Sequence, residues 1–159
     1  MIYNIQMSNC IELEEGWSKI QPNIDRLVQQ LWPSKGVHHA SPIGDPEISS
    51  KEYMSTFTQV YNMCTQKPPH NYSDQLYERY KQTVEQIFKE NVIPRLDGDP
   101  DTDLSAVVKD QLYRFRIFVR CMSALFSYLD RFHVQRQDLP SLKDSQLYEQ
   151  QILLKIGSE

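Results

Sequence analysis

The chain has 159 residues, the length of one compact domain, and its 40% hydrophobic and 24% charged residues exclude a disordered chain. Its formal net charge of −4 disfavours a general binder of nucleic-acid backbones, which is usually basic. Arg116, Arg120 and Arg131 interrupt the most apolar segment, so no run reaches the roughly 18 residues of a membrane span.

The first predicted helix covers residues 13 to 31. Its apolar residues recur every three or four positions, the period of one helix face: Leu13, Trp17, Ile20, Ile24, Leu27 and Leu31. Pro22 lies within this stripe, and because proline removes a backbone donor we expect a kink or a restart near Gln21. Prolines and glycines then predict a long, mobile polar loop over residues 33 to 48.

The second and third helices begin at recognisable caps. Ser49 is followed three residues later by Glu52, the spacing of a capping box, and this helix runs to about Gln66 before two prolines. Its apolar stripe is Tyr53, Phe57, Val60, Tyr61 and Cys64. We expect Ser73 to cap a third helix that continues to Pro94.

The loop D-G-D-P-D-T-D at residues 97 to 103 spaces carboxylates as a calcium-binding EF-hand does. Thr102 stands where that loop needs glycine and Val108 where it needs glutamate, so we interpret it as a solvated loop. Its acidic residues Asp99 to Asp103 place negative charge before a helix N-terminus, which is favourable.

Residues 103 to 136 have a helical pattern throughout. We expect a break near Tyr113 to Phe115, which gives a short fourth helix and a buried fifth helix containing Ile117, Cys121, Leu125, Tyr128 and Phe132. A short terminal helix is predicted from Leu147 to Ile156.

Catalytic and metal-binding patterns are weak in this sequence. No two of its four histidines have the i, i+4 spacing that aims both at one ion, and we expect no metal, no cofactor and no enzyme activity. Three widely spaced cysteines, Cys10, Cys64 and Cys121, indicate reduced thiols of an intracellular protein. The aromatic stripe of the second helix is typical of a core and also of interface anchors.

Three strings resemble the cullin family. YMSTFTQVYNMCTQKPPHNYSDQLYERY, at residues 53 to 80, is similar to the first cullin repeat, above all to type-one cullins of plants. SYLDRFHVQRQDLPSL and IELEEGWSKIQPNIDRL resemble later and opening segments of that repeat. The resemblance implies an all-α, cullin-repeat-like five-helix bundle over residues 11–144, with an N-terminal extension at 1–10 and a divergent tail at 145–159.

Cullins are scaffolds of multisubunit ubiquitin ligases, so the resemblance implies a non-catalytic role in the cytoplasm and nucleus. In type-one cullins the second and fifth helices of the first repeat bind a Skp-type BTB-like adaptor, which carries an F-box protein. By position, the partner-binding residues are Tyr53, Met54, Phe57, Val60 and Tyr61 on the second helix and Arg116, Arg120 and Arg131 on the fifth.

The sequence also departs from the family. Cullins are several times longer, and the RING-binding region and the modified lysine have no counterpart here, so we expect no RING partner. Such a module is expected to compete with an intact cullin for adaptor. Two alternatives stay open: a helical protein that binds nucleic acid through its arginine segment, and a degenerate remnant that folds but binds nothing.

Overall fold

The computed structural model describes residues 10–33, 46–97, 101 and 103–157, and the regular structure in these residues is entirely helical. The predicted all-α fold class is therefore confirmed. In chain order, the elements are α1 (Leu13–Leu31), α2 (Ser50–Thr65), α3 (Ser73–Ile87), the π-helical segment η1 (Phe88–Val92), α4 (Ile93–Leu96), α5 (Leu104–Leu125), the π-helical segment η2 (Leu129–Val134), α6 (Gln135–Gln137) and α7 (Gln146–Gly157).

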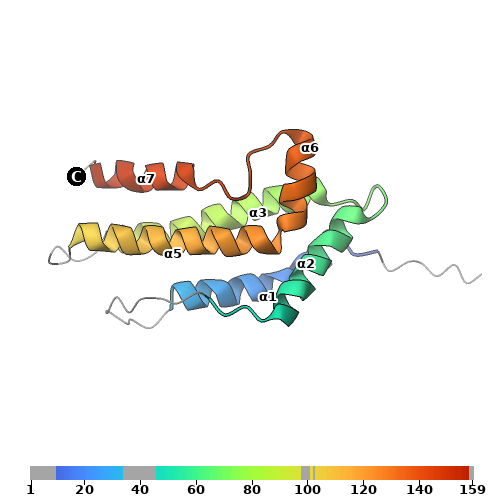
Figure 1. The fold of residues 1–159 in the computed structure, drawn as a ribbon, viewed down its shortest axis with the longest axis horizontal. Helices are drawn as coiled ribbons and strands as arrows, with labels where there is room; N and C mark the ends of the chain where they lie inside the picture. The colour runs from blue at the N-terminus through green and yellow to red at the C-terminus, as the bar shows by residue number, and fades with distance from the viewer. Residues whose placement is uncertain (1–9, 34–45, 98–100, 102, 158–159) are drawn as a thin grey trace, which may run out of the picture.

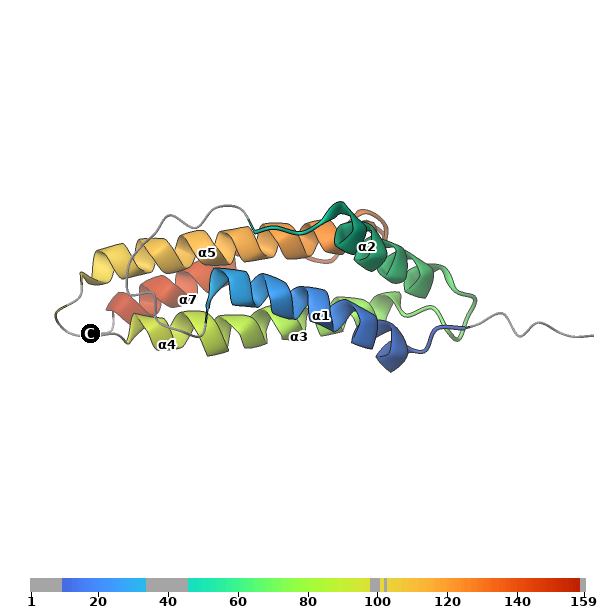
Figure 2. The same ribbon diagram turned by 90° about the horizontal axis from the view of Figure 1, so that it is seen from below.

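The helices form an elongated bundle with one distinct end. α1, α5, α7 and the run from α3 to α4 lie along the long axis (Figures 1 and 2). α2 lies obliquely at one end, and α6 turns away from the axis at the same end (Figure 1). α2 contacts α1, α5 and η2 there. No helix in the described part of the chain is long and apolar enough to cross a membrane.

α1 passes through Pro22 as one helix, so the predicted restart near Gln21 is wrong. Proline in a helix interior costs about 3 kcal/mol, but Ile20 and Ile24 are fully buried on the opposite face and hold the helix against the bundle. On the outer face Gln21 accepts a hydrogen bond from Trp17 Nε1 at 2.8 Å and donates one to Asp25 at 2.8 Å.

The capping box of α2 is confirmed. The Glu52 backbone N–H donates to Ser49 Oγ at 3.2 Å, and the Ser49 backbone N–H donates to Glu52 Oε2 at 3.1 Å. α1 and α2 approach closely at Gly16, where any Cβ would lie 2.3 Å from the Met63 sulfur. Of the predicted loop at 33 to 48, residues 34–45 lie outside the described residues.

The third predicted helix differs from expectation at both ends. Tyr72, not Ser73, is the N-cap of α3, and the Asn71 side chain accepts a hydrogen bond from the Ser73 backbone N–H at 3.2 Å. The helical run also continues past Pro94, because η1 widens the turn and leaves Pro94 in the first turn of α4. In a regular α-helix the proline ring would clash with the carbonyl oxygen four residues earlier, and the wider π-helical turn before Pro94 relieves that clash.

α5 is continuous, so the predicted break near Tyr113 to Phe115 is wrong. Phe115 is fully buried, and the Asp110–Arg114 ion pair at 2.8 Å spans the predicted break on the helix surface. The α-helix instead ends at Leu125. As a consequence, Phe132 in η2 is 45% exposed and not part of a buried fifth helix. Asp103 lies directly before α5, as expected for negative charge at a helix N-terminus, and it also caps α5 by accepting from the Ser105 N–H at 3.0 Å. Asp99 lies outside the described residues.

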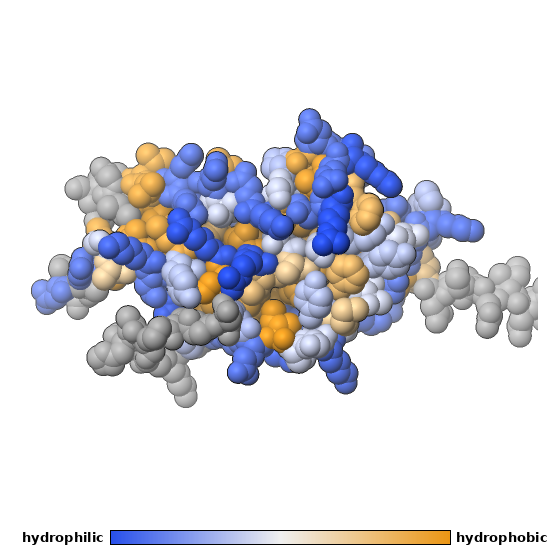
Figure 3. Space-filling model, viewed as in Figure 1, coloured by the Kyte–Doolittle hydropathy of each residue, from blue (hydrophilic) through white to orange (hydrophobic). Residues whose placement is uncertain are grey.

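The predicted terminal helix is present as α7. Its Ile152 is fully buried, and the Tyr148 ring lies 5.0 Å from that of Phe88 and 5.1 Å from that of Phe115. The opposite side of α7 is apolar but exposed, and hydrophobic residues reach the surface over this helix (Figure 3). The exposed residues are Leu147, Leu153 and Leu154.

Candidate functional site

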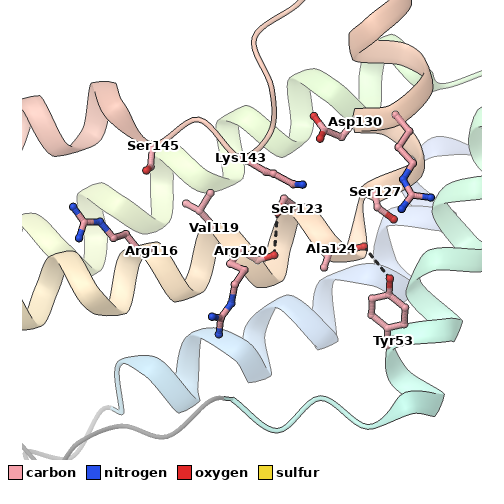
Figure 4. Close-up of a pocket in the computed structure, with 11 residues that line it drawn as sticks. Tyr53, Arg116, Val119, Arg120, Ser123, Ala124, Ser127, Asp130, Lys143 and Ser145 are labelled. Atoms are coloured by element: carbon pink, nitrogen blue, oxygen red, sulfur yellow. Dashed lines mark hydrogen bonds between the residues drawn. The ribbon is translucent and has the colours of Figure 1, made fainter.

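A groove of about 610 Å³ lies where α2 meets the end of α5 (Figure 4). Four of the eight predicted partner-binding residues line it together: Tyr53, Arg116, Arg120 and Arg131. Its other walls come from α5, from η2 and from the segment before α7, which contributes Lys143 and Ser145. The fold thus brings residues far apart in the sequence to one surface.

Tyr53 connects α2 to the groove. Its hydroxyl donates to the backbone oxygen of Ala124 at 3.4 Å (Figure 4), and Ala124 lies in the last turn of α5. The Tyr53 ring stacks on Phe57 one turn later, with the ring centroids 6.3 Å apart. Both side chains are half-buried, so they support α2 and also present surface.

The three predicted arginines do not share one helix. Arg116 and Arg120 lie on α5, whereas Arg131 lies on η2, beyond the bend at Phe126. Placing all three on a single fifth helix was therefore wrong, because the α-helix ends at Leu125, before Arg131. All three side chains are exposed at the groove.

Arg116 is neutralised within the fold. Its guanidinium donates two hydrogen bonds to Glu149 on α7, at 2.9 and 3.1 Å. This pairing raises the pKa of Arg116 and holds the pKa of Glu149 below its usual value. Arg120, Arg131 and Lys143 add positive charge to the groove, against one acid in its lining, Asp130.

Asp130 shapes the groove wall. Its Oδ1 accepts from the backbone N–H of Leu142 at 2.9 Å and from the hydroxyl of Ser141 at 3.1 Å. These bonds fix the segment before α7 against η2, and Lys143 follows directly. The carboxylate is therefore occupied by structural hydrogen bonds.

Beside the groove, α2 and η2 form an aromatic patch made of Tyr61, Tyr128 and Phe132. Tyr61 meets Tyr128 edge to face at 5.0 Å, and Tyr128 lies 4.6 Å from Phe132. Tyr61 and Phe132 are 44% and 45% exposed, unusual values for large aromatic side chains. Sequence reasoning missed Tyr128 and Phe132 as surface residues, although their i, i+4 spacing already placed them on one helix face.

The remaining predicted residues of α2 differ in depth. Met54 is 53% exposed, next to Tyr53, whereas Val60 has no exposed surface and belongs to the core with Met63. Cys64 is also buried, and burial raises the pKa of its thiol to about 11. The Cys64 thiol is therefore protonated at neutral pH and does not act as a nucleophile.

Comparison with known proteins gives a consistent family. The Cullin alpha solenoid domain profile matches residues 17–158, a range that includes most of the tail set apart at 145–159. The chain is 37% identical to Cullin-1 of Oryza sativa subsp. japonica over 134 residues, which is 84% of this chain and 17% of the relative. It is 34% identical to Putative cullin-like protein 1 of Arabidopsis thaliana over 141 residues, 88% of this chain and 18% of that protein.

A third relative, Cullin-2 of Arabidopsis thaliana, is 31% identical over 130 residues, which is 82% of this chain and 16% of that protein. No solved structure matches the chain. The chain thus spans less than a fifth of the length of these three relatives. Because the domain profile covers most of the chain and the matches extend over more than four fifths of it, the protein belongs to the cullin family.

Proposed function

We propose that this chain is a non-catalytic scaffold module of an SCF-type cullin-RING ubiquitin ligase and that it binds a Skp-type adaptor, which carries an F-box protein. The strongest support is that side chains of α2 and η2 lie together and form one exposed surface. The aromatic patch and the basic groove lie side by side there, with Tyr128 of the patch next to Ser127 of the groove.

The aromatic patch supplies the buried area of the proposed interface. Tyrosine and phenylalanine give a large contact area for few rotatable bonds, and such residues dominate binding energy at the centre of interfaces. Met54 extends the apolar surface along α2. An interface of standard size buries on the order of 1,600 Å² in total, shared between the two partners.

The basic groove gives the complex its orientation. Arg120, Arg131 and Lys143 attract an acidic partner surface and raise its rate of association. Arg116 contributes less, since Glu149 already neutralises it. Val60 supports α2 from the core and makes no direct contact in this proposal.

The alternative of nucleic-acid binding has less support from the same contacts. Arg114 pairs with Asp110 at 2.8 Å and Arg116 with Glu149 at 2.9 Å, so two arginines of the segment are engaged within the fold. A continuous basic face for phosphates is therefore not formed along α5.

A competition experiment tests the proposal. The 159-residue chain is added in excess to a reconstituted SCF ligase, and ubiquitination of the substrate is followed over time. We expect the chain to occupy the adaptor and to lower the rate. A Tyr53→Ala, Phe57→Ala double variant, shown by circular dichroism to be folded, should no longer compete. An unchanged rate with excess wild-type chain would refute the proposal.

A further inference from the structure

Three side chains capable of binding a metal meet at the start of the bundle, away from the residues that line the groove. Cys10 and Glu12 lie on the segment before α1, and His70 lies in the turn between α2 and α3. The thiol, one carboxylate oxygen and one imidazole nitrogen all lie within 4.8 Å of one another. The contact between His70 Nε2 and Glu12 Oε1 is 3.5 Å.

Gln66 holds the two segments together. Its side-chain oxygen accepts from the Ile11 backbone N–H at 2.6 Å, and its Nε2 donates to the Ile11 oxygen at 3.0 Å. The same Nε2 donates to the backbone oxygen of His70 at 2.8 Å. One amide side chain thus ties the segment of Cys10 and Glu12 to the turn of His70.

Tyr72 orients the carboxylate. Its hydroxyl donates to Glu12 Oε2 at 2.7 Å, which leaves Oε1 directed to His70. Tyr72 itself is buried, and its ring packs edge to face against the His70 ring at 6.4 Å. Hydrogen bonds of this kind to a ligating carboxylate are the usual support of metal sites in proteins.

We propose that Cys10, Glu12 and His70 bind a zinc ion, with water as the fourth ligand. A thiolate, an imidazole and a carboxylate are the ligand types that zinc takes, whereas calcium and magnesium take oxygen ligands. Donor atoms about 2.0–2.3 Å from a tetrahedral zinc lie roughly 3.5 Å apart, so the histidine–glutamate pair already has the spacing of two zinc ligands. The Cys10 thiol lies within 4.8 Å of both of these ligand atoms.

The bound ion would fasten the segment before α1 to the turn between α2 and α3. A metal that binds only the folded arrangement stabilises it, so zinc should raise the resistance of this segment to unfolding and protect the Cys10 thiol from alkylation. This inference is independent of adaptor binding, because none of the three ligands lines the basic groove or belongs to the aromatic patch.

Cobalt(II) is the probe, because its tetrahedral thiolate complexes absorb visibly and zinc displaces it. The full 159-residue chain is titrated with cobalt(II) and then with zinc. We expect a thiolate-to-cobalt charge-transfer band that saturates at one cobalt ion per chain. The band should be lost in Cys10→Ser and kept in the matched control Cys121→Ser. Zinc should also slow alkylation of Cys10 in the wild-type chain.

The zinc affinity of each variant, measured by competition with a chromophoric chelator, distinguishes residues that ligate the ion from residues that support the ligands. His70→Asn and Glu12→Gln should each weaken zinc binding at least about 100-fold, and Tyr72→Phe, which keeps the ring, about 10- to 100-fold. The absence of a charge-transfer band in the wild-type chain would overturn the proposal. Equal zinc affinity of wild type, Cys10→Ser and His70→Asn would overturn it too, since binding would then be elsewhere.

Discussion

The ring of Tyr61 on α2 meets the ring of Tyr128, which immediately precedes η2, edge to face with 5.0 Å between their centroids. This contact joins two helical segments that are far apart in the sequence. Phe132 continues the row one turn further, 4.6 Å from Tyr128. Because Tyr61 and Phe132 remain almost half exposed, the row acts as surface and not as core.

Truncation of side chains in the aromatic patch should weaken adaptor binding without unfolding the chain. In Tyr61→Ala and Phe132→Ala we expect each loss to cost about 2 kcal/mol of binding free energy or more, as for central aromatic residues of an interface. Tyr113→Ala is the matched control, since Tyr113 is 51% exposed but outside the patch and the groove lining. If all three variants bound the adaptor with the affinity of the wild-type chain, the aromatic patch would not be part of the interface.

Charge reversal in the groove should act mainly on the association rate. The Arg120→Glu, Arg131→Glu double variant is expected to bind the adaptor about tenfold more slowly at low salt, and the difference should shrink as salt rises. Lys89→Glu, a reversal on η1 outside the groove, is the control. Stopped-flow fluorescence measures both rates. A defect confined to dissociation, with no dependence on salt, would contradict the steering role.

Ile152 and Leu153 offer a direct test of how α7 is held. Ile152 is fully buried and Leu153 is 61% exposed, although they are neighbours. We expect Ile152→Ala to cost about 2–5 kcal/mol of unfolding free energy and Leu153→Ala to stay within about 0.5 kcal/mol of wild type. Denaturant unfolding followed by circular dichroism compares them. Equal, small losses would mean that α7 does not pack on the bundle.

The buried Cys64 thiol predicts a loss of stability at alkaline pH. Burial raises its pKa from an ordinary value of 9.0 to about 11, so the folded chain holds the proton more tightly than the unfolded chain. Its contribution is fully present below about pH 9 and is lost as the pH rises toward 11. Between pH 8 and 10.5 the wild type should lose roughly 2 kcal/mol more than Cys64→Ala, measured by denaturant unfolding. If the unfolding free energies of the wild type and Cys64→Ala fell by the same amount over this pH range, the raised pKa of Cys64 would be contradicted.

Local sequence signals predicted much of the fold. The Ser49–Glu52 capping box depends on residues three apart, so the start of α2 was readable from the sequence. Pro22 and the unbroken α5 were misjudged for the opposite reason, because packing along a whole helix face outweighs a local preference. That packing depends on residues distant in the sequence.

The candidate surfaces were harder to predict for the same reason. The stripe on α2 was visible, but which of its residues is exposed depends on how α1, α5 and η2 cover it; Val60 is buried while Tyr61 is not. The exposure of Phe132 depends on the bend after α5. The meeting of Cys10 and Glu12 with His70 likewise requires the tertiary fold, since His70 is far from the other two residues in the sequence.

The most direct test of the central claim is a calorimetric titration of the purified chain with a plant Skp-type adaptor. We predict saturable binding at one adaptor per chain, through the surface that α2 and η2 form. A chain that is folded by circular dichroism yet releases or absorbs no heat of binding at several temperatures would contradict the claim, and the fold would then exist without the adaptor-binding role.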